Sequence, residues 1–156
     1  MTPLLFACAI GAALVSGIFF AFSTFLMQAL GRLEPREGIS AMQSINIAVI
    51  NPLFFLPFFG TGVLCIVTIA VALVTNSSQS FTLMLAGSFL YLVGCLGVTV
   101  AGNVPLNDRL AKANRGEVEA ESLWTRYLVS WTRWNHIRTA ASLAAAVAFM
   151  IALRMA

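Results

Sequence analysis

The sequence predicts an all-α fold, a bundle of four transmembrane helices in which residues 1–156 form a single membrane domain. Of the 156 residues, 60% are hydrophobic and 10% are charged, and the mean hydropathy is +0.90. Soluble domains carry about 25% charged residues. The apolar residues are gathered in long runs, and about 18 or more consecutive apolar residues are typical of a membrane-spanning helix. We therefore expect the chain to contact membrane lipid.

The first span is predicted at about residues 4–30. Ala13, Gly17 and Ala21 recur in it every four residues, a pattern that lets another helix approach closely. Residues 31–50 then combine charged residues with apolar ones at helical spacing. This segment predicts a short helix that lies on the membrane surface or folds under the bundle.

The second span is predicted at about residues 52–74. Asn51 suits the N-cap position, and Pro52 suits the first helical position. Pro57, followed by two glycines, predicts a kink or close packing near this end of the span.

The third and fourth spans are predicted at about 81–102 and 137–153. A tight polar turn is expected over 75–80, before the third span. The segment 103–107, with sequence NVPLN, is expected to interrupt the third helix, and a polar segment should continue to about Ser122. One long helix then runs through Leu153, with an amphipathic first half.

The basic residues predict the orientation of the bundle. The net charge is +3, but most of the nine lysines and arginines lie between apolar spans, where they report membrane topology and lipid contact and not nucleic-acid binding. Eight of the nine fall on the two long connections or the start of the last span. These connections are therefore expected in the cytoplasm and both termini outside. The eight are Arg32, Arg36, Arg109, Lys112, Arg115, Arg126, Arg133 and Arg138.

Metal and cofactor motifs are missing from the sequence. Cys8, Cys65 and Cys95 lie in apolar runs without CxxC spacing, which favours packing residues. His136 is the single histidine, and one histidine cannot provide bis-histidine haem or copper ligation. We expect no metal and no cofactor.

Polar residues collect at one end of the predicted bundle. In a four-span topology, the residues before span two, after span three and before span four all lie at the cytoplasmic end. Their convergence there predicts a candidate site. Its members are Gln43, Asn46, Asn51, Asn103, Asn107, Trp131, Trp134, Asn135, His136 and Arg138.

Each of these residues also has a purely structural interpretation. The tryptophans can be interfacial anchors, Arg138 can reach lipid head groups, and Asn51 is explained by capping alone. At 100° per residue, Trp131, Asn135 and Arg138 share one face of a helix, whereas His136 points about 160° away from Arg138. His136 and Arg138 can act together only from different sides of a substrate.

Several motifs together resemble those of the anthrone oxygenase-like membrane family. They are SGIFFAFS at 16–23, GI with AMQSIN at 38–46, Asn51–Pro52, GNVPLN at 102–107, and Trp131 with WNHIRT at 134–139. The resemblance implies the four-span fold and, since most members are bacterial, a bacterial inner membrane. The fungal enzymes of this family oxidise anthrones to anthraquinones with O₂, without metal or flavin.

The resemblance also implies roles for the polar cluster. A base removes an acidic C–H proton, the resulting anion reduces O₂, and donors stabilise the enolate oxygen in a dry apolar slot. The expected catalytic residues are His136 as base, Arg138 as anion stabiliser and Asn135 as donor. The expected substrate-binding residues are Asn103, Asn107, Asn46, Gln43 and, as a stacking wall, Trp131.

Two other function classes stay open on the sequence alone. One is a non-catalytic lipid- or quinone-binding protein, or a small-solute carrier, although the predicted mid-membrane region lacks the polar path that a carrier needs. The other is a structural or assembly partner that uses its small-residue faces, including in a homo-oligomer.

Overall fold

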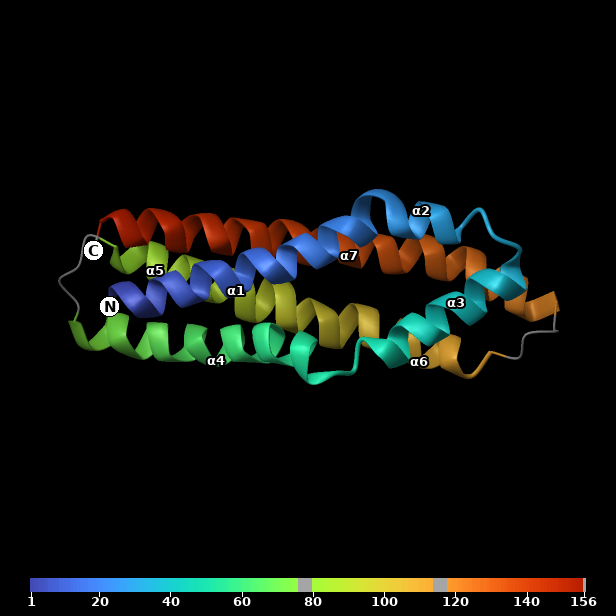
Figure 1. Cartoon of the computed structure of the whole chain (residues 1–156), viewed down its shortest axis with the longest axis horizontal. Helices are drawn as coiled ribbons and strands as arrows, with labels where there is room; N and C mark the ends of the chain where they lie inside the picture. The colour runs from blue at the N-terminus through green and yellow to red at the C-terminus, as the bar shows by residue number, and fades with distance from the viewer. Residues whose placement is uncertain (76–79, 114–117, 156) are drawn as a thin grey trace.

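The computed structural model describes residues 1–75, 80–113 and 118–155, with the side chains of 118–120 left out. All regular elements in these residues are helices, arranged as four long rods and one short helix (Figure 1). The expected turn over 75–80 lies largely outside the described residues.

The first rod combines α1 (Thr2–Ala21), a π-helical turn η1 (Phe22–Leu26) and α2 (Met27–Leu30). The second rod is α4 (Pro52–Thr75). Asn51 caps it as expected, because its Oδ1 accepts a hydrogen bond of 3.0 Å from the backbone N–H of Phe54.

The third rod continues well past the expected break. It consists of α5 (Phe81–Phe89), two π-helical segments, η2 (Leu90–Gly97) and η3 (Thr99–Asn103), and α6 (Val104–Ala111). The predicted interruption at 103–107 is wrong. Pro105 stands in the first turn of α6, where the missing N–H of proline is tolerated.

The fourth rod is the single long helix α7 (Val118–Arg154). It is long and apolar enough to cross a membrane, and the expected span 137–153 lies within it. The arginines in its first half, such as Arg126 and Arg133, point outward, while Trp124, Tyr127 and Trp131 are buried.

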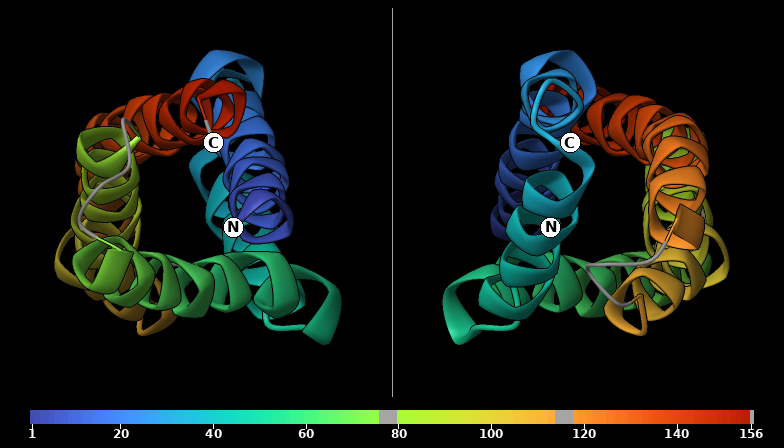
Figure 2. Two further views of the ribbon diagram at one scale, coloured as in Figure 1. Left: turned by 90° about the vertical axis from the view of Figure 1, so that its left-hand side faces the viewer. Right: turned by 90° about the vertical axis from the view of Figure 1, so that its right-hand side faces the viewer.

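The four rods form the sides of a square when the bundle is viewed from its ends (Figure 2). α7 lies between α1 and α5, and α4 closes the opposite side. Both termini lie at one end of the bundle, and α3 (Pro35–Ala48) packs beside α6 and the start of α7 at the other end (Figure 1). Of the two positions expected for the short helix, α3 therefore takes the one under the bundle.

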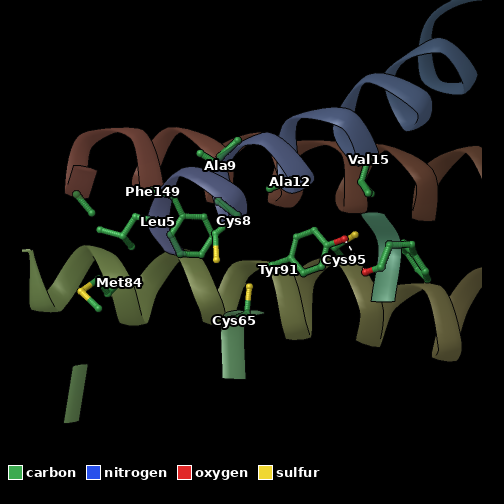
Figure 3. Packing of buried hydrophobic residues seen from close by; sticks show 14 of the residues in the cluster. Leu5, Cys8, Ala9, Ala12, Val15, Cys65, Met84, Tyr91, Cys95 and Phe149 are labelled. Atoms are coloured by element: carbon green, nitrogen blue, oxygen red, sulfur yellow. Dashed lines mark hydrogen bonds between the residues drawn. The ribbon is translucent and has the colours of Figure 1, made fainter. Parts of the chain in front are cut away.

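The core has two parts. The first surrounds Leu5, Cys8, Tyr91 and Phe149 in the half of the bundle that holds the termini (Figure 3). The three cysteines are buried in this part and form no disulfide. The second lies under α3 and joins Ile39 and Met42 to the aromatic side chains of α7.

The outer surface of the rods is apolar. Several side chains of α4 are at least 60% exposed, among them Leu53, Leu56, Val63 and Val74. In the described residues, four helices are long and apolar enough to cross a bilayer, and α4 is one of them. Monomeric soluble proteins rarely expose such continuous apolar surface. The protein is an integral membrane protein.

Close helix approach occurs at other small residues than expected. Ala13 and Gly17 face outward, and a Cβ atom placed on Gly17 would meet nothing within 4 Å. Other glycines make tight contacts instead, among them Gly11 with Thr61 and Gly94 with Ala141. The expected close packing after Pro57 does occur, because a Cβ on Gly62 would lie 2.7 Å from Leu96 Cδ1.

Gly94→Ala is expected to destabilise the bundle, because the added Cβ would lie 2.6 Å from the Cβ of Ala141. Overpacking of this kind costs about 1–3 kcal/mol. Gly17→Ala is the matched control and should stabilise the helix by up to about 1 kcal/mol. Thermal unfolding in detergent measures both variants. Equal stability of the two would contradict the close contact between the third rod and α7.

Candidate ligand-binding cavity

A cavity of about 880 Å³ lies where the two parts of the core meet. Phe19 and Phe58 of the first part and Met42 and Trp131 of the second part line it. Its volume is in the range of sites that hold small organic ligands. Seven of its lining residues are aromatic, and these come from α1, η1, α4 and α7. The aromatic lining consists of Phe19, Phe22, Phe54, Phe55, Phe58, Phe59 and Trp131.

Arg138 places a buried positive charge in the wall of this cavity. The side chain is 5% exposed, and its guanidinium carbon lies 3.8 Å from the ring centroid of Phe19 and 4.8 Å from that of Trp131. Its Nη1 donates a long hydrogen bond of 3.4 Å to Thr99 Oγ1. Within the described part of the chain, no carboxylate forms an ion pair with it.

This arrangement is unusual because a buried charge normally has a partner of opposite charge. The two aromatic faces offset part of the desolvation cost by cation–π attraction. The remaining electrostatic potential is directed at the cavity, so the site is suited to an anionic or strongly polar oxygen of a ligand.

Asn135 holds Arg138 in place. Its Oδ1 accepts a hydrogen bond of 2.8 Å from Arg138 Nε, and its Nδ2 donates to the Phe19 carbonyl oxygen at 2.7 Å and to Ser23 Oγ at 2.8 Å. Asn135 is fully buried and is not part of the cavity wall. It therefore holds the guanidinium in position from behind the cavity wall.

The π-helical segments flank this site. The Phe19 and Phe20 carbonyls, in the turn before η1, accept hydrogen bonds from the side chains of Asn135 and Thr24. On the third rod, η3 carries Thr99 and Asn103 into the cavity wall. Single π-helical turns are frequent at functional sites, and here they place side chains from two rods around Arg138.

Two asparagines of the third rod line the cavity one turn apart. Asn103 is 1% exposed, and its Nδ2 donates to the Trp131 carbonyl oxygen at 3.2 Å. Its buried Oδ1 has no hydrogen-bond partner among the described residues, which is costly for a buried acceptor.

Asn107 is held more firmly. Its Oδ1 accepts hydrogen bonds of 2.8 Å from both Tyr127 Oη and Trp131 Nε1. Its Nδ2 donates to no described residue. The amide orientation is therefore fixed, and its donor side is unused.

The residues expected from α3 also reach the cavity. Gln43 lines it while its Nε2 donates to the Leu110 carbonyl oxygen at 2.8 Å. Asn46 also lines it, with its side-chain amide beside the Tyr127 hydroxyl.

His136 lies elsewhere. It is exposed and is not part of the cavity wall, whereas Arg138 is buried. This is the outcome that the helical angle between them requires. The structure thus brings Gln43, Asn46, Asn103, Asn107, Trp131 and Arg138 together around one cavity, with Asn135 behind them and His136 outside.

Sequence reasoning missed Thr99, Asp108 and the phenylalanine walls. Phe54 and Phe58 stand four residues apart directly after the Asn51 cap, and Thr99 stands one turn before Asn103, so helical spacing could have indicated them. In the described residues, no group of three histidine, cysteine, aspartate or glutamate side chains is placed to hold a metal ion.

Arg138→Met is expected to cost no more than about 1–3 kcal/mol of stability in detergent, because the loss of the donor to the buried Asn135 Oδ1 is offset in part by the removal of an uncompensated buried charge. Asn135→Leu should destabilise by about 1–3 kcal/mol, since it leaves Arg138 Nε without its acceptor. A large loss of stability in Arg138→Met would show that the guanidinium serves the fold and not a ligand.

Comparison with known proteins is consistent with the earlier resemblance. The family profile described as anthrone oxygenase matches residues 53–148. No curated protein gives a significant match. No solved structure gives one either. The matched segment is more than half of the chain and includes Asn103, Asn107, Trp131 and Arg138 of the cavity wall. The protein belongs to the anthrone oxygenase family.

Proposed function

We propose that the protein is a cofactor-independent oxygenase that oxidises a flat, hydrophobic aromatic substrate, anthrone- or quinol-like, in this cavity. The observation that carries the proposal is the buried guanidinium of Arg138, which faces an aromatic-lined cavity without a carboxylate partner among the described residues. Such a charge stabilises an anion that forms during the reaction better than it stabilises a neutral substrate.

The chemistry proceeds through the substrate anion. A base removes one proton from the methylene carbon of an anthrone, and the electron pair spreads onto the carbonyl oxygen, which Arg138 faces. The anion transfers an electron to O₂, and the radical pair combines to form a C–O bond. After protonation, the hydroperoxide loses the second C–H proton and its O–O bond breaks. The carbon becomes a carbonyl, and one water molecule leaves.

Asp108 takes the role of base in this proposal. It is the carboxylate among the described cavity-lining residues, and a carboxylate near the substrate carbon can accept the proton. His136, the base expected from sequence, is exposed outside the cavity. The phenylalanine walls provide the dry surroundings in which the attraction between the anion and Arg138 is strongest.

A second candidate function is binding of a quinone or lipid without turnover. The same aromatic cavity favours it, because stacking alone can hold such a molecule. Transport of a polar solute has less support, because the core around Leu5, Cys8, Cys65 and Phe149 is closely packed and fully buried.

The purified protein is expected to accelerate O₂ consumption with an anthrone, with one anthraquinone formed for each O₂ consumed. Arg138→Met should lower kcat by about 10²–10³-fold, the usual loss when one stabilising donor to an oxyanion is removed. Arg133→Met is the matched control, because Arg133 lies on the same helix and is exposed. Asp108→Asn should lower turnover more than His136→Ala. Equal rates in wild type and Arg138→Met would refute the proposal, and bound ligand without turnover would favour the second candidate.

We also infer that both termini lie outside and that α3 and α6 face the cytoplasm of a bacterial cell, in its inner membrane. The termini share one end of the bundle, and eight of the nine basic residues belong to the two long connections or the first part of α7.

A reporter that is active only outside the cytoplasm should therefore be active when it is fused after Met155. The same reporter should be inactive when it is inserted between Gly31 and Glu34, in the segment that joins α2 to α3. The reverse pattern of reporter activity would show that the termini lie in the cytoplasm, which contradicts the inferred orientation.

A further inference from the structure

The amide of Asn107 is clamped in a single orientation. Tyr127 and Trp131 stand one turn apart on α7, and both donate to Asn107 Oδ1 at 2.8 Å. Two donors on the same oxygen identify it as oxygen, because the amide nitrogen accepts no hydrogen bond. The Nδ2 branch of the planar amide therefore points away from these two donors, and Asn107 lines the cavity.

Trp131 connects this amide to Arg138. The indole Nε1 donates to Asn107, and the face of the same ring lies 4.8 Å from the guanidinium carbon of Arg138. The indole therefore contacts both the clamped amide and the uncompensated cation, and all three side chains line the cavity. Both groups favour oxygen acceptors, and both favour a negatively charged oxygen over a neutral one.

Other ionisable groups do not cancel this preference. Arg138 of α7 and Asp108 of α6 are the ionisable side chains among the described residues that line the cavity; α1, η1, α3 and α4 contribute apolar, hydroxyl and amide groups. Asp108 is exposed, so solvent screens its charge, whereas Arg138 is buried.

We propose that Asn107 Nδ2 and Arg138 together form an oxyanion site that makes the cavity select ionised hydroxyaryl ketones over neutral analogues of the same shape. The inference rests on the part of the proposed function that places the ligand in this cavity, and it does not depend on oxidation. Asn107 is the specificity residue of the pair, because its donor side is available only while Tyr127 and Trp131 hold its oxygen.

The test uses 2-hydroxyanthraquinone and its methyl ether, 2-methoxyanthraquinone, as probes. The hydroxyl probe changes its visible spectrum on ionisation, so a pH titration in the presence of the detergent-solubilised protein reports the charge of the bound form without turnover. Bound to wild type, the probe should ionise about one pH unit lower than in empty detergent micelles, which corresponds to about tenfold tighter binding of the anion. The methyl ether should bind at least tenfold more weakly than the anion.

Asn107→Asp separates a binding role from a structural one. The variant keeps an oxygen for Tyr127 and Trp131 but replaces the donor with a second oxygen and a negative charge. The bound hydroxyl probe should then ionise at a higher pH than in micelles, while binding of the methyl ether stays within about threefold of wild type, since a neutral ligand responds little to the added charge.

Two further variants complete the design. Tyr127→Phe removes one of the two donors that hold Asn107 Oδ1. It should weaken the preference for the anion, but less than Asn107→Asp does. Asn51→Asp is the control for added charge. An aspartate keeps the cap on the Phe54 N–H but loses the hydrogen bond from Asn51 Nδ2 to the Ala48 carbonyl oxygen, and it should leave the preference unchanged because residue 51 does not line the cavity. Thermal unfolding of each variant confirms that it is folded.

The inference fails if Asn107→Asp retains the preference for the anion, or if wild type binds the hydroxyl probe and its methyl ether equally or binds neither. A clear preference for the anion without turnover of any anthrone would instead refute the oxygenase proposal and leave the oxyanion site intact.

Discussion

The candidate site depends on how one guanidinium is held inside an apolar bundle. Arg138 lies between the rings of Phe19 and Trp131, and its Nε donates to Asn135. Asn135 in turn uses both hydrogens of its amide on the first rod, at the Phe19 carbonyl and Ser23. Each partner offsets part of the cost of burying the charge, but none of them neutralises it. The first rod, α7 and the third rod must therefore meet at this point, and the field of the cation remains available to a ligand.

The cavity exists because the bundle is packed differently along its length. Near the termini, small residues such as Gly11 and Gly94 let the rods touch, and the core is closed. Towards the other end, α3 takes a place under the bundle, and large aromatic side chains replace the small ones. The space left between these two parts is lined by phenylalanines and by polar groups from the ends of the rods. An apolar slot with a few fixed polar groups is the usual form of a small-molecule site.

A chemistry without metal or organic cofactor is compatible with such a site because the substrate itself supplies the electrons. The protein has to stabilise an anion, exclude water and provide a base. In the proposed oxygenase, Arg138 and the clamped Asn107 serve the first need, the aromatic walls serve the second, and Asp108 at the cavity is available for the third. In the same proposal Asn135, which is fully buried and bonded to Arg138, acts through the arginine.

Much of this protein could be predicted from local sequence. The apolar runs determined four membrane helices, Asn51 and Pro52 determined the start of α4, and helical angles alone separated His136 from Arg138. The gathering of amides at one end followed from the number of spans. Tertiary structure decided the rest. The third rod continues through Pro105, Gly11 and Gly94 make close contacts where Gly17 makes none, and Asn107 lines the cavity whereas Asn135 lies behind it. The physical reason is that periodicity and capping act within a few residues, whereas the use of an amide depends on partners such as Phe19 and Asn135, which are 116 residues apart in the chain.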